Sequence, residues 1–390
     1  SEDGMTLVYS DSPLGVIGVI DITDPRAPKP LGNIDMQGEP TTTVIKGDMA
    51  FVGVNTSASF TEPSGALRSV DLTGNQVVAN CDLGGQPDSV ALSPKGDMIA
   101  VAIENERDEE VNDGALPQMP AGFVVRLPLK DGAVDCAAKQ VVDLTGLAEV
   151  APEDPEPEFL AFNEAGELVV TLQENNHIVL IGADGSVAAH FSAGAVDLDG
   201  IDSDKDGKID PSASLAAVPR EPDAVAWIDT DHFVTANEGD WQGGSRGFTI
   251  WDKTGSVTYD SGNLLDRELM RIGHYPEGRS GKKGGDPEAD IFAPYADHPL
   301  IIVACERGSI VFVFDVTDPA APKLLQALPS GIGPEGLVAI PDRNLFATAN
   351  ETDLGEDGAA RAHVMIYDRT EAAPAYPTIA ASGDVTGWGA

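Results

Sequence analysis

One short sequence pattern recurs along the chain: an apolar stretch that runs into a turn rich in Asp, Thr, Gly and Pro. Seven copies are spaced by roughly 50 to 70 residues, which is the period of β-propeller blades. A β-sandwich would give shorter and less regular spacing. The repeat therefore predicts an all-β, seven-bladed β-propeller. The copies contain Asp21, Asp71, Asp131, Asp184, Asp252, Asp315 and Asp368.

Within each repeat we expect four short antiparallel strands. In the second repeat these are residues 89–92, 98–102, 123–127 and 140–143, and the turn at residues 93–97 (SPKGD) makes the first two a hairpin. The chain starts in mid-blade, with residues 5–10 beside the place of an inner strand. Residues 376–381 would supply the missing strand, so that N- and C-terminal strands close the ring. We assign residues 1–381 to the propeller and residues 382–390 to a tail, or to a linker to an absent domain.

The chain is strongly acidic, with 64 Asp and Glu residues against 24 Lys and Arg residues and a formal net charge of −40. Such a charge excludes nucleic acid and anionic membrane surfaces as partners, and it favours divalent cations or a salty exterior. Hydrophobic residues make up 42% of the chain, enough for a sizeable core, and no apolar run of about 18 residues could span a membrane. The start at Ser1, without Met, fits the processed end of a secreted or periplasmic protein, although an artificial start would look the same.

The chain has three cysteines. Cys81 and Cys136 lie in neighbouring repeats, each in a short polar stretch beside a strand, so a disulfide between them and two free thiols are alternatives. Cys305 ends an apolar strand and is expected to be a buried thiol.

Five blades carry a pair of acidic residues. One acid directly follows Pro where the chain enters the innermost strand, and the other follows the second strand. Both loops open on the same face of a propeller, so both acids should point at one mouth of the channel. Another blade departs from the pattern, with Thr41 and Asn55 in these places, so the ring is asymmetric. The pairs are Asp88 with Glu104, Glu158 with Glu174, Asp223 with Glu238, Glu288 with Glu306, and Glu335 with Glu351.

Carboxylates gathered around one axis repel one another and require bound cations, Arg or Lys partners, or raised pKa values. Hard oxygen ligands select Ca²⁺ or a similar ion over Zn²⁺ or Cu²⁺. In the alternative interpretation, the acids accept N–H bonds from turns and only hold the blades together. If a metal is bound, we expect it on the side of the ring formed by the last three pairs, from Asp223 to Glu351.

A second metal signal is local, at residues 202–210 (DSDKDGKID). Alternate acids can wrap one hard cation, Gly207 permits the sharp turn, and a backbone carbonyl adds a ligand. The twelfth position is Ala213, so the closing Glu of an EF-hand is missing, and Asp197 or Asp199 could complete the site. An acidic surface turn is the alternative. The expected ligands are Asp202, Asp204, Asp206, Asp210 and the carbonyl of Lys208.

One basic stretch stands out: Arg267, Arg271, His274, Arg279, Lys282 and Lys283. It leads directly into the pair that begins at Glu288, so it could overhang the channel mouth and hold a phosphate or carboxylate ligand beside a metal. A solvated loop that pairs with the acidic rim is the alternative. No nucleophile motif is recognisable. The candidate catalytic residues are therefore Glu238, Glu288, Glu351, Arg279 and Lys283.

Several motifs are spread over most of the chain: residues 171–176 (TLQENN), 202–207 (DSDKDG), 222–224 (PDA), 235–240 (TANEGD), 279–280 (RS), 287–288 (PE) and 333–336 (GPEG). Together they resemble the choice-of-anchor I propeller family. The resemblance implies an exported bacterial protein, and some members are described as alkaline phosphatases. The chain departs from the family at Gly281 and Lys282, where acidic residues are expected, and it lacks a long insertion after Asp240. Residues 376–379 and 388–390 resemble the start of an esterase-like phytase domain, which implies an absent C-terminal partner domain.

These observations leave three functional hypotheses. The first is a Ca²⁺-dependent hydrolase of phosphate esters, in which a channel metal activates water and Arg279 and Lys283 hold a phosphorylated small molecule. The second is a non-catalytic module that binds metal or docks a partner domain at the acidic mouth. The third is a purely structural propeller. Catalysis has no support in the sequence beyond the basic stretch, so cation binding is the more general prediction.

Overall fold

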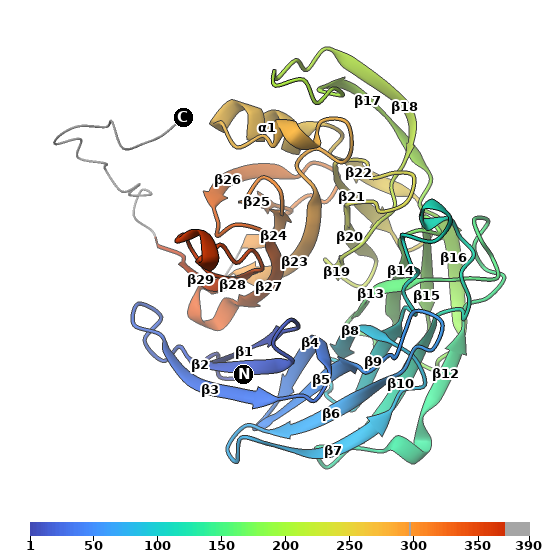
Figure 1. Cartoon of the computed structure of the whole chain (residues 1–390), viewed down its shortest axis with the longest axis vertical. Coiled ribbons are helices and arrows are strands. Elements are labelled where there is room, and N and C mark those ends of the chain that lie inside the picture. The colour runs from blue at the N-terminus through green and yellow to red at the C-terminus, as the bar shows by residue number, and fades with distance from the viewer. Residues whose placement is uncertain (296–297, 371–390) are drawn as a thin grey trace.

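The computed structural model describes residues 1–295 and 298–370. Their strands form seven small antiparallel sheets arranged as blades around a central axis (Figure 1), which confirms the predicted seven-bladed β-propeller. An additional two-stranded sheet is an insertion between two blades. Within the described ranges, α1 (Leu264–Ile272) is the one α-helix. No helix found there has both the length and the apolar surface needed to cross a membrane.

The first four blades follow one another in chain order. The first consists of β1 (Thr6–Asp11), β2 (Val16–Asp21) and β3 (Lys29–Asp35). The second consists of β4 (Glu39–Lys46), β5 (Met49–Asn55), β6 (Gly65–Asp71) and β7 (Gln76–Asp82). The third consists of β8 (Pro87–Leu92), β9 (Met98–Ile103), β10 (Phe123–Lys130), β11 (Ala133–Val134) and β12 (Gln140–Asp143). The fourth consists of β13 (Pro157–Phe162), β14 (Leu168–Leu172), β15 (His177–Ile181) and β16 (Val187–Ser192).

The remaining blades complete the ring. The fifth consists of β19 (Val225–Trp227), β20 (His232–Asn237), β21 (Gly247–Asp252) and β22 (Val257–Asp260). The sixth consists of β23 (Pro287–Tyr295), β24 (His298–Cys305), β25 (Ile310–Asp315) and β26 (Lys323–Pro329). The seventh consists of β27 (Pro334–Ile340), β28 (Leu345–Asn350) and β29 (His363–Asp368). Each of the seven copies of the repeat thus lies at the end of the third strand of a blade or in the turn that follows this strand.

The apolar pattern of each strand matches its position in the blade. β14 (LVVTL) is buried at every position, because a second strand is covered on both faces by neighbouring blades. β16 (VAAHFS), at the outer edge of the same blade, alternates half-buried with exposed residues. The cores lie between blades: Val169 and Ile178 of the fourth blade pack with Phe233 and Trp251 of the fifth.

The ring closes where the first blade meets the seventh. Leu7 and Ile22 pack against Ala347. Arg343 donates hydrogen bonds to the carbonyl oxygens of Gly4 (2.6 Å) and Ile22 (2.8 Å). Within the described residues the first blade lacks an innermost strand, since β1 occupies the second position, as expected for residues 5–10. The closing strand predicted at residues 376–381, and the tail at 382–390, lie outside the described residues.

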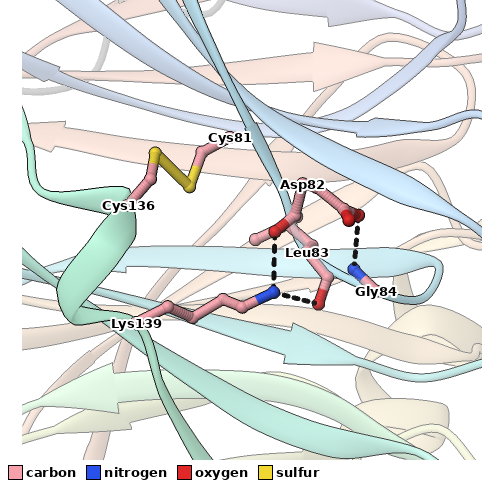
Figure 2. Close-up of a disulfide and its surroundings, with 6 residues drawn as sticks. All are labelled: Cys81, Asp82, Leu83, Gly84, Cys136 and Lys139. Atoms are coloured by element: carbon pink, nitrogen blue, oxygen red, sulfur yellow. Dashed lines mark hydrogen bonds between the residues drawn. A yellow bond between two sulfur atoms is a disulfide. The ribbon is translucent and has the colours of Figure 1, made fainter.

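A disulfide joins the second and third blades. Cys81 of β7 is bonded to Cys136, with 5.7 Å between the Cα atoms and 55 residues between the two positions in the chain (Figure 2). Lys139 of the same turn donates to the carbonyl oxygens of Asp82 (2.8 Å) and Leu83 (3.5 Å). Of the two alternatives left by the sequence, the disulfide is the one observed. Cys305 is a free, buried thiol, as predicted.

Two insertions flank the fifth blade. The first is the hairpin of β17 (Ala195–Ile201) and β18 (Ala213–Pro219), whose connection is the acidic loop of residues 202–210. The second runs from β22 to β23 and contains α1 and the basic stretch. Leu265 and Leu269 of α1, one turn apart, are fully buried, and Gly273 ends the helix in the left-handed conformation (φ +80°) that glycine adopts without strain.

Candidate functional site

In four of the five pairs a bulge in the innermost strand redirects the first acid, whereas Asp223 lies just before β19. Pro87 pairs with Ile103, but the register then shifts before Val90, so Asp88 falls within the irregularity. The same shift follows Pro157, Pro287 and Pro334. A β-bulge bends the strand and redirects a side chain. The Pro-acid step that marked these positions in the sequence is therefore the start of a bulge.

The second acid of each pair follows the neighbouring strand at the same end of the blade. Glu104, Glu238, Glu306 and Glu351 come directly after β9, β20, β24 and β28, and Glu174 lies two residues beyond β14. Since the two strands are antiparallel, the start of one lies beside the end of the other. Both acids of a pair therefore meet at one end of the blade.

The structure brings two groups of three carboxylates together. Oxygens of Asp88, Glu104 and Glu158 lie within 4.8 Å of one another, and so do oxygens of Asp223, Glu238 and Glu288. Each group unites the pair of one blade with the first acid of the next. We call these the first triad and the second triad. Within the described chain, no such group includes Glu174, Glu306, Glu335, Glu351 or the acids of the loop at residues 202–210.

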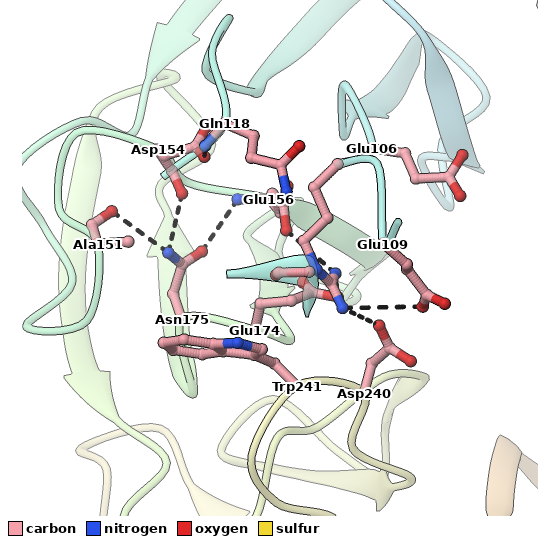
Figure 3. A network of polar contacts seen from close by, with 12 residues as sticks. Glu106, Glu109, Gln118, Ala151, Asp154, Glu156, Glu174, Asn175, Asp240 and Trp241 are labelled. Atoms are coloured by element: carbon pink, nitrogen blue, oxygen red, sulfur yellow. Dashed lines mark hydrogen bonds and ion pairs between the residues drawn. The ribbon is translucent and has the colours of Figure 1, made fainter. Parts of the chain in front are cut away.

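Arg107 organises the mouth beside the first triad, and sequence reasoning missed it. Its guanidinium is nearly buried, at 4% side-chain exposure. It donates to Glu174 (2.7 Å), to the carbonyl oxygen of Gly114 (3.0 Å) and to Asp240. Glu156 lies 3.5 Å away. In Figure 3 the labelled Glu156, Glu174 and Asp240 lie around the guanidinium of Arg107, which is drawn without a label. Its partners come from two other blades, a proximity that no spacing along the chain reveals.

Two more cations neutralise acids further around the mouth. The Lys283 ammonium lies 2.9 Å from Glu238 and 3.4 Å from Asp240. Arg307 pairs with Glu306 and lies 3.9 Å from Glu351.

The basic stretch is thus partly engaged within the protein. Arg279, a candidate for holding an anion, donates to the buried Asp286 (2.6 Å). Lys283, the other candidate, is already paired with Glu238 and Asp240. These contacts match the alternative that the stretch pairs with the acidic rim.

The second acids of the pairs are therefore not equivalent. Glu174, Glu238 and Glu306 are each contacted by an Arg or Lys. Glu104 is only 8% exposed, and no basic side chain of the described residues contacts it. Its neighbours Asp88 and Glu158, which are half-buried, also have no contact with a basic side chain of the described residues.

The first triad also does not hold the turns. Among the described residues, its carboxylates accept no hydrogen bond from a turn, and asparagine side chains serve that role instead. The backbone N–H of Gln86 donates to Asn105 (2.9 Å), and that of Glu156 donates to Asn175 (2.9 Å). One oxygen of Glu158 is fully buried without a partner. The interpretation that these acids merely brace the blades does not fit the first triad.

Burial and mutual repulsion raise the pKa values of the uncompensated acids. Burial, and then the negative charges of Glu335, Glu106 and Glu174, raise the pKa of Asp88 from 3.8 to about 7. The pKa values of Glu104 and Glu158 are also held well above their usual range, mainly by burial and then by neighbouring carboxylates.

In the second triad burial raises the pKa of Glu238, but the ammonium of Lys283 opposes this rise. The first triad has no such opposing charge and must therefore hold protons or a cation at neutral pH.

A cavity of about 180 Å³ lies between the triads. Glu104 and Glu158 of the first triad and Glu238 of the second triad line it together with other carboxylates, and Arg107 and Gln173 are the lining residues that are not acidic. At about 30 Å³ per water, this space holds roughly six waters, enough for a hydrated ion. The walls consist mainly of carboxylates, so the cavity favours a cation.

Two further acids are buried with unpartnered oxygens. Asp290 of β23 is 3% exposed, and neither of its oxygens has a partner within the described part of the chain. Asp202, at the start of the acidic loop, is 2% exposed with one unpartnered oxygen, whereas Asp204, Asp206 and Asp210 are exposed. The sequence predicted Asp202 as a ligand but gave no signal for Asp290, which lies within a strand.

Comparisons with known proteins support the fold. A profile described as the choice-of-anchor I domain matches residues 1–243 and 241–319. A search of curated proteins found no match.

Solved structures share the architecture at low identity. The chain resembles Kuenenia stuttgartiensis hydrazine synthase at 15% identity with a TM-score of 0.60, covering 95% of this chain and 94% of that one. It resembles virginiamycin B lyase from Staphylococcus aureus at 11% identity with a TM-score of 0.55, covering 90% and 89%. A functionally unknown protein from Desulfotomaculum acetoxidans is similar at 10% identity with a TM-score of 0.57, covering 88% of each chain. At such identities the likeness concerns the fold alone.

Proposed function

The chain belongs to the choice-of-anchor I family, and from that premise we propose that it is an exported β-propeller that binds a divalent cation, Ca²⁺, at the acidic mouth of its channel. We further propose that the protein is a binding or docking module rather than a catalyst. The ion would lie at the first triad, with Asp88, Glu104 and Glu158 as ligands. Waters in the adjoining cavity would complete its shell.

The observation that carries this proposal is that equivalent acids of successive blades differ in whether a basic side chain contacts them. Three successive second acids each have a cation of the protein beside them, and Glu104 has none. A buried carboxylate without a counter-charge is costly, so an external cation at the first triad would supply what Arg107, Lys283 and Arg307 supply elsewhere. The ligand set consists of carboxylate oxygens alone, which favours Ca²⁺ and its flexible shell of six to eight oxygens.

The contacts of the basic stretch argue against the hydrolase hypothesis. Arg279 and Lys283 were expected to hold a phosphate, but both are paired with acids at 2.6 Å and 2.9 Å. A phosphate would have to compete with Asp286 for Arg279 and with Glu238 for Lys283. Glu238, Glu288 and Glu351 therefore remain candidate ligands rather than catalytic groups in this proposal.

Export is consistent with the disulfide between Cys81 and Cys136, because such bonds persist in oxidising compartments and are rare in the cytosol. The family premise points the same way. Both a secreted and a periplasmic location agree with these observations.

Calorimetry on chelator-treated protein tests the proposal. We expect Ca²⁺ to bind with a Kd in the range of about 10⁻⁴ to 10⁻³ M, as in extracellular modules. The double variant Asp88→Asn/Glu104→Gln should lose one ion. A control with the same charge change, Asp48→Asn/Glu164→Gln, alters exposed acids outside both triads and should bind as the wild type does.

Undiminished binding by the triad variant would refute the site. Turnover of p-nitrophenyl phosphate by calcium-loaded wild type, lost in the triad variant, would refute the non-catalytic assignment. Absence of turnover in both proteins is the expected result.

A further inference from the structure

The acidic loop between β17 and β18 lacks one ligand within its own sequence. Residues 202–210 carry acids at the first, third, fifth and ninth positions and glycine at the sixth, as in the loops that wrap Ca²⁺ in EF-hands. Gly207 has a φ of +81°, the conformation that the sharp turn requires. The twelfth position, which closes an EF-hand with a bidentate Glu, is Ala213 in β18.

A carboxylate from a distant part of the chain lies at this loop. The backbone N–H of Gly207 donates to Glu277 at 2.5 Å, across a separation of 70 residues. Glu277 begins the short 3-10 helix of residues 277–279, in the insertion that follows the fifth blade. The missing carboxylate is thus supplied beside the loop by another segment.

A buried charge within the loop points independently to a ligand. Asp202 is 2% exposed. One of its oxygens accepts the N–H of Asp204 (3.4 Å), which turns the carboxylate into the loop, and the other is buried without a partner. A buried, unpaired carboxylate oxygen is costly unless it gains a cation or a hydrogen bond.

We propose that residues 202–210 bind one Ca²⁺ and that Glu277 is its closing ligand. The loop would contribute Asp202, Asp204, Asp206 and the carbonyl of Lys208, with Asp210 ligating directly or through water. The exposed acids of the loop do not converge in the structure, so the ion must draw them towards Asp202. On binding, Glu277 moves from the N–H of Gly207 to the ion.

The site would fasten two insertions to each other. Arg246 is fully buried, and it already donates to the carbonyl oxygens of Asp202 (2.9 Å), Ser280 (2.7 Å) and Lys282 (2.7 Å). The insertion that contains Ser280 and Lys282 continues into Lys283, which contacts Glu238 of the second triad. An ion held by both insertions would therefore order the segment that carries Lys283. No ligand is shared with the first triad, so this site stands or falls independently of the proposed function.

Terbium luminescence tests the proposal, because Tb³⁺ occupies calcium sites and emits when a nearby tyrosine is excited. The Tyr275 hydroxyl lies 3.4 Å from the carbonyl oxygen of Asp202. We expect tyrosine-sensitised emission from the wild type that Ca²⁺ displaces, and little emission from Tyr275→Phe. Asp88→Asn/Glu104→Gln should keep this emission, which separates the loop from the channel mouth.

Glu277→Gln should weaken Tb³⁺ binding at least about tenfold, the loss typical of a damaged metal site. Glu356→Gln, an exposed acid in another blade, is the control and should bind as the wild type does. Asp206→Asn changes a half-exposed side chain of the loop and provides a second variant whose folding is not at risk.

Hydrogen exchange gives a second readout. Ca²⁺ should slow exchange at residues 202–210 and 275–281 of the wild type, and only at 202–210 in Glu277→Gln. Wild-type affinity in Glu277→Gln, or protection that never reaches residues 275–281, would overturn the role of Glu277. Absence of sensitised emission in the wild type would overturn the loop site itself.

Discussion

Asp88→Asn should stabilise the calcium-free protein, although it removes a residue of the proposed site. Asp88 is half-buried between Glu104 and Glu158, and its pKa is raised from 3.8 to about 7. Because the folded state holds this proton more tightly than the unfolded chain does, stability is greatest below pH 4 and is lost as the pH rises through about 7. At 1.36 kcal/mol per pKa unit, the loss amounts to about 4 kcal/mol. Asparagine has nearly the same shape and does not ionise.

Urea denaturation with a chelator at pH 4.5 and pH 7.5 measures this effect. Asp88→Asn should raise the free energy of unfolding by up to about 4 kcal/mol at pH 7.5 and by about 1 kcal/mol at pH 4.5. The control Asp48→Asn changes an exposed acid and should alter it by under about 0.5 kcal/mol.

Calcium should reduce the difference in the free energy of unfolding between Asp88→Asn and the wild type at pH 7.5. At 100 times its Kd, the ion stabilises the wild type by about 2.7 kcal/mol. It should not stabilise Asp88→Asn to the same extent, because a ligand is missing. If Asp88→Asn is less stable than the wild type at pH 7.5 in chelator, or if its effect is the same at both pH values, the account of the first triad is wrong.

Three other perturbations follow from the contacts. Arg107→Met should lower the free energy of unfolding, measured by thermal denaturation, by about 3 to 5 kcal/mol, because it leaves buried carboxylates unpaired. The control Arg26→Met removes an exposed ion pair with Asp368, whose side chains are 79% and 38% exposed, and should lower it by under about 1 kcal/mol. Reducing the bond between Cys81 and Cys136 should cost about 4 kcal/mol, given the 55-residue separation, and should lower the Tm measured by calorimetry. Arg343→Ala should cost about 2 to 4 kcal/mol and speed amide exchange in residues 4–23, because it removes hydrogen bonds that tie the first blade to the seventh.

The sequence predicts the fold well because a propeller repeats its local chemistry. The seven turn signals recur at the period of a blade, and each one lies at the end of a third strand. The predicted strands of the second repeat match β8, β9, β10 and β12 to within a few residues. The Pro-acid steps also located one mouth of the channel, because each coincides with a bulge or the start of an innermost strand.

The contacts between loops of different blades were not predictable in the same way. Arg107 lies 67 residues before Glu174 and 133 residues before Asp240, and nothing in its own neighbourhood indicates these partners. For the same reason the sequence could not decide whether the basic stretch holds an anion or pairs with the acidic rim, and the structure shows Arg279 and Lys283 paired with acids. The ring was expected to bind metal on the side from Asp223 to Glu351, where the second triad lies, and this stays a prediction. Our proposal prefers the first triad because no basic side chain of the described residues contacts it.

The difference between the two sides rests on the number of counter-charges rather than the number of acids. A repeating pair of carboxylates creates nearly equivalent positions around the mouth, and repetition alone makes each of them equally suited to a cation. Loops break the equivalence, because Arg107, Lys283 and Arg307 all lie in connections between strands and each contacts the second acid of a pair. In a propeller of this kind, a metal site is therefore best sought at the acidic position that no loop of the protein neutralises. Among the second acids of the described chain that position is Glu104, with Asp88 and Glu158 beside it.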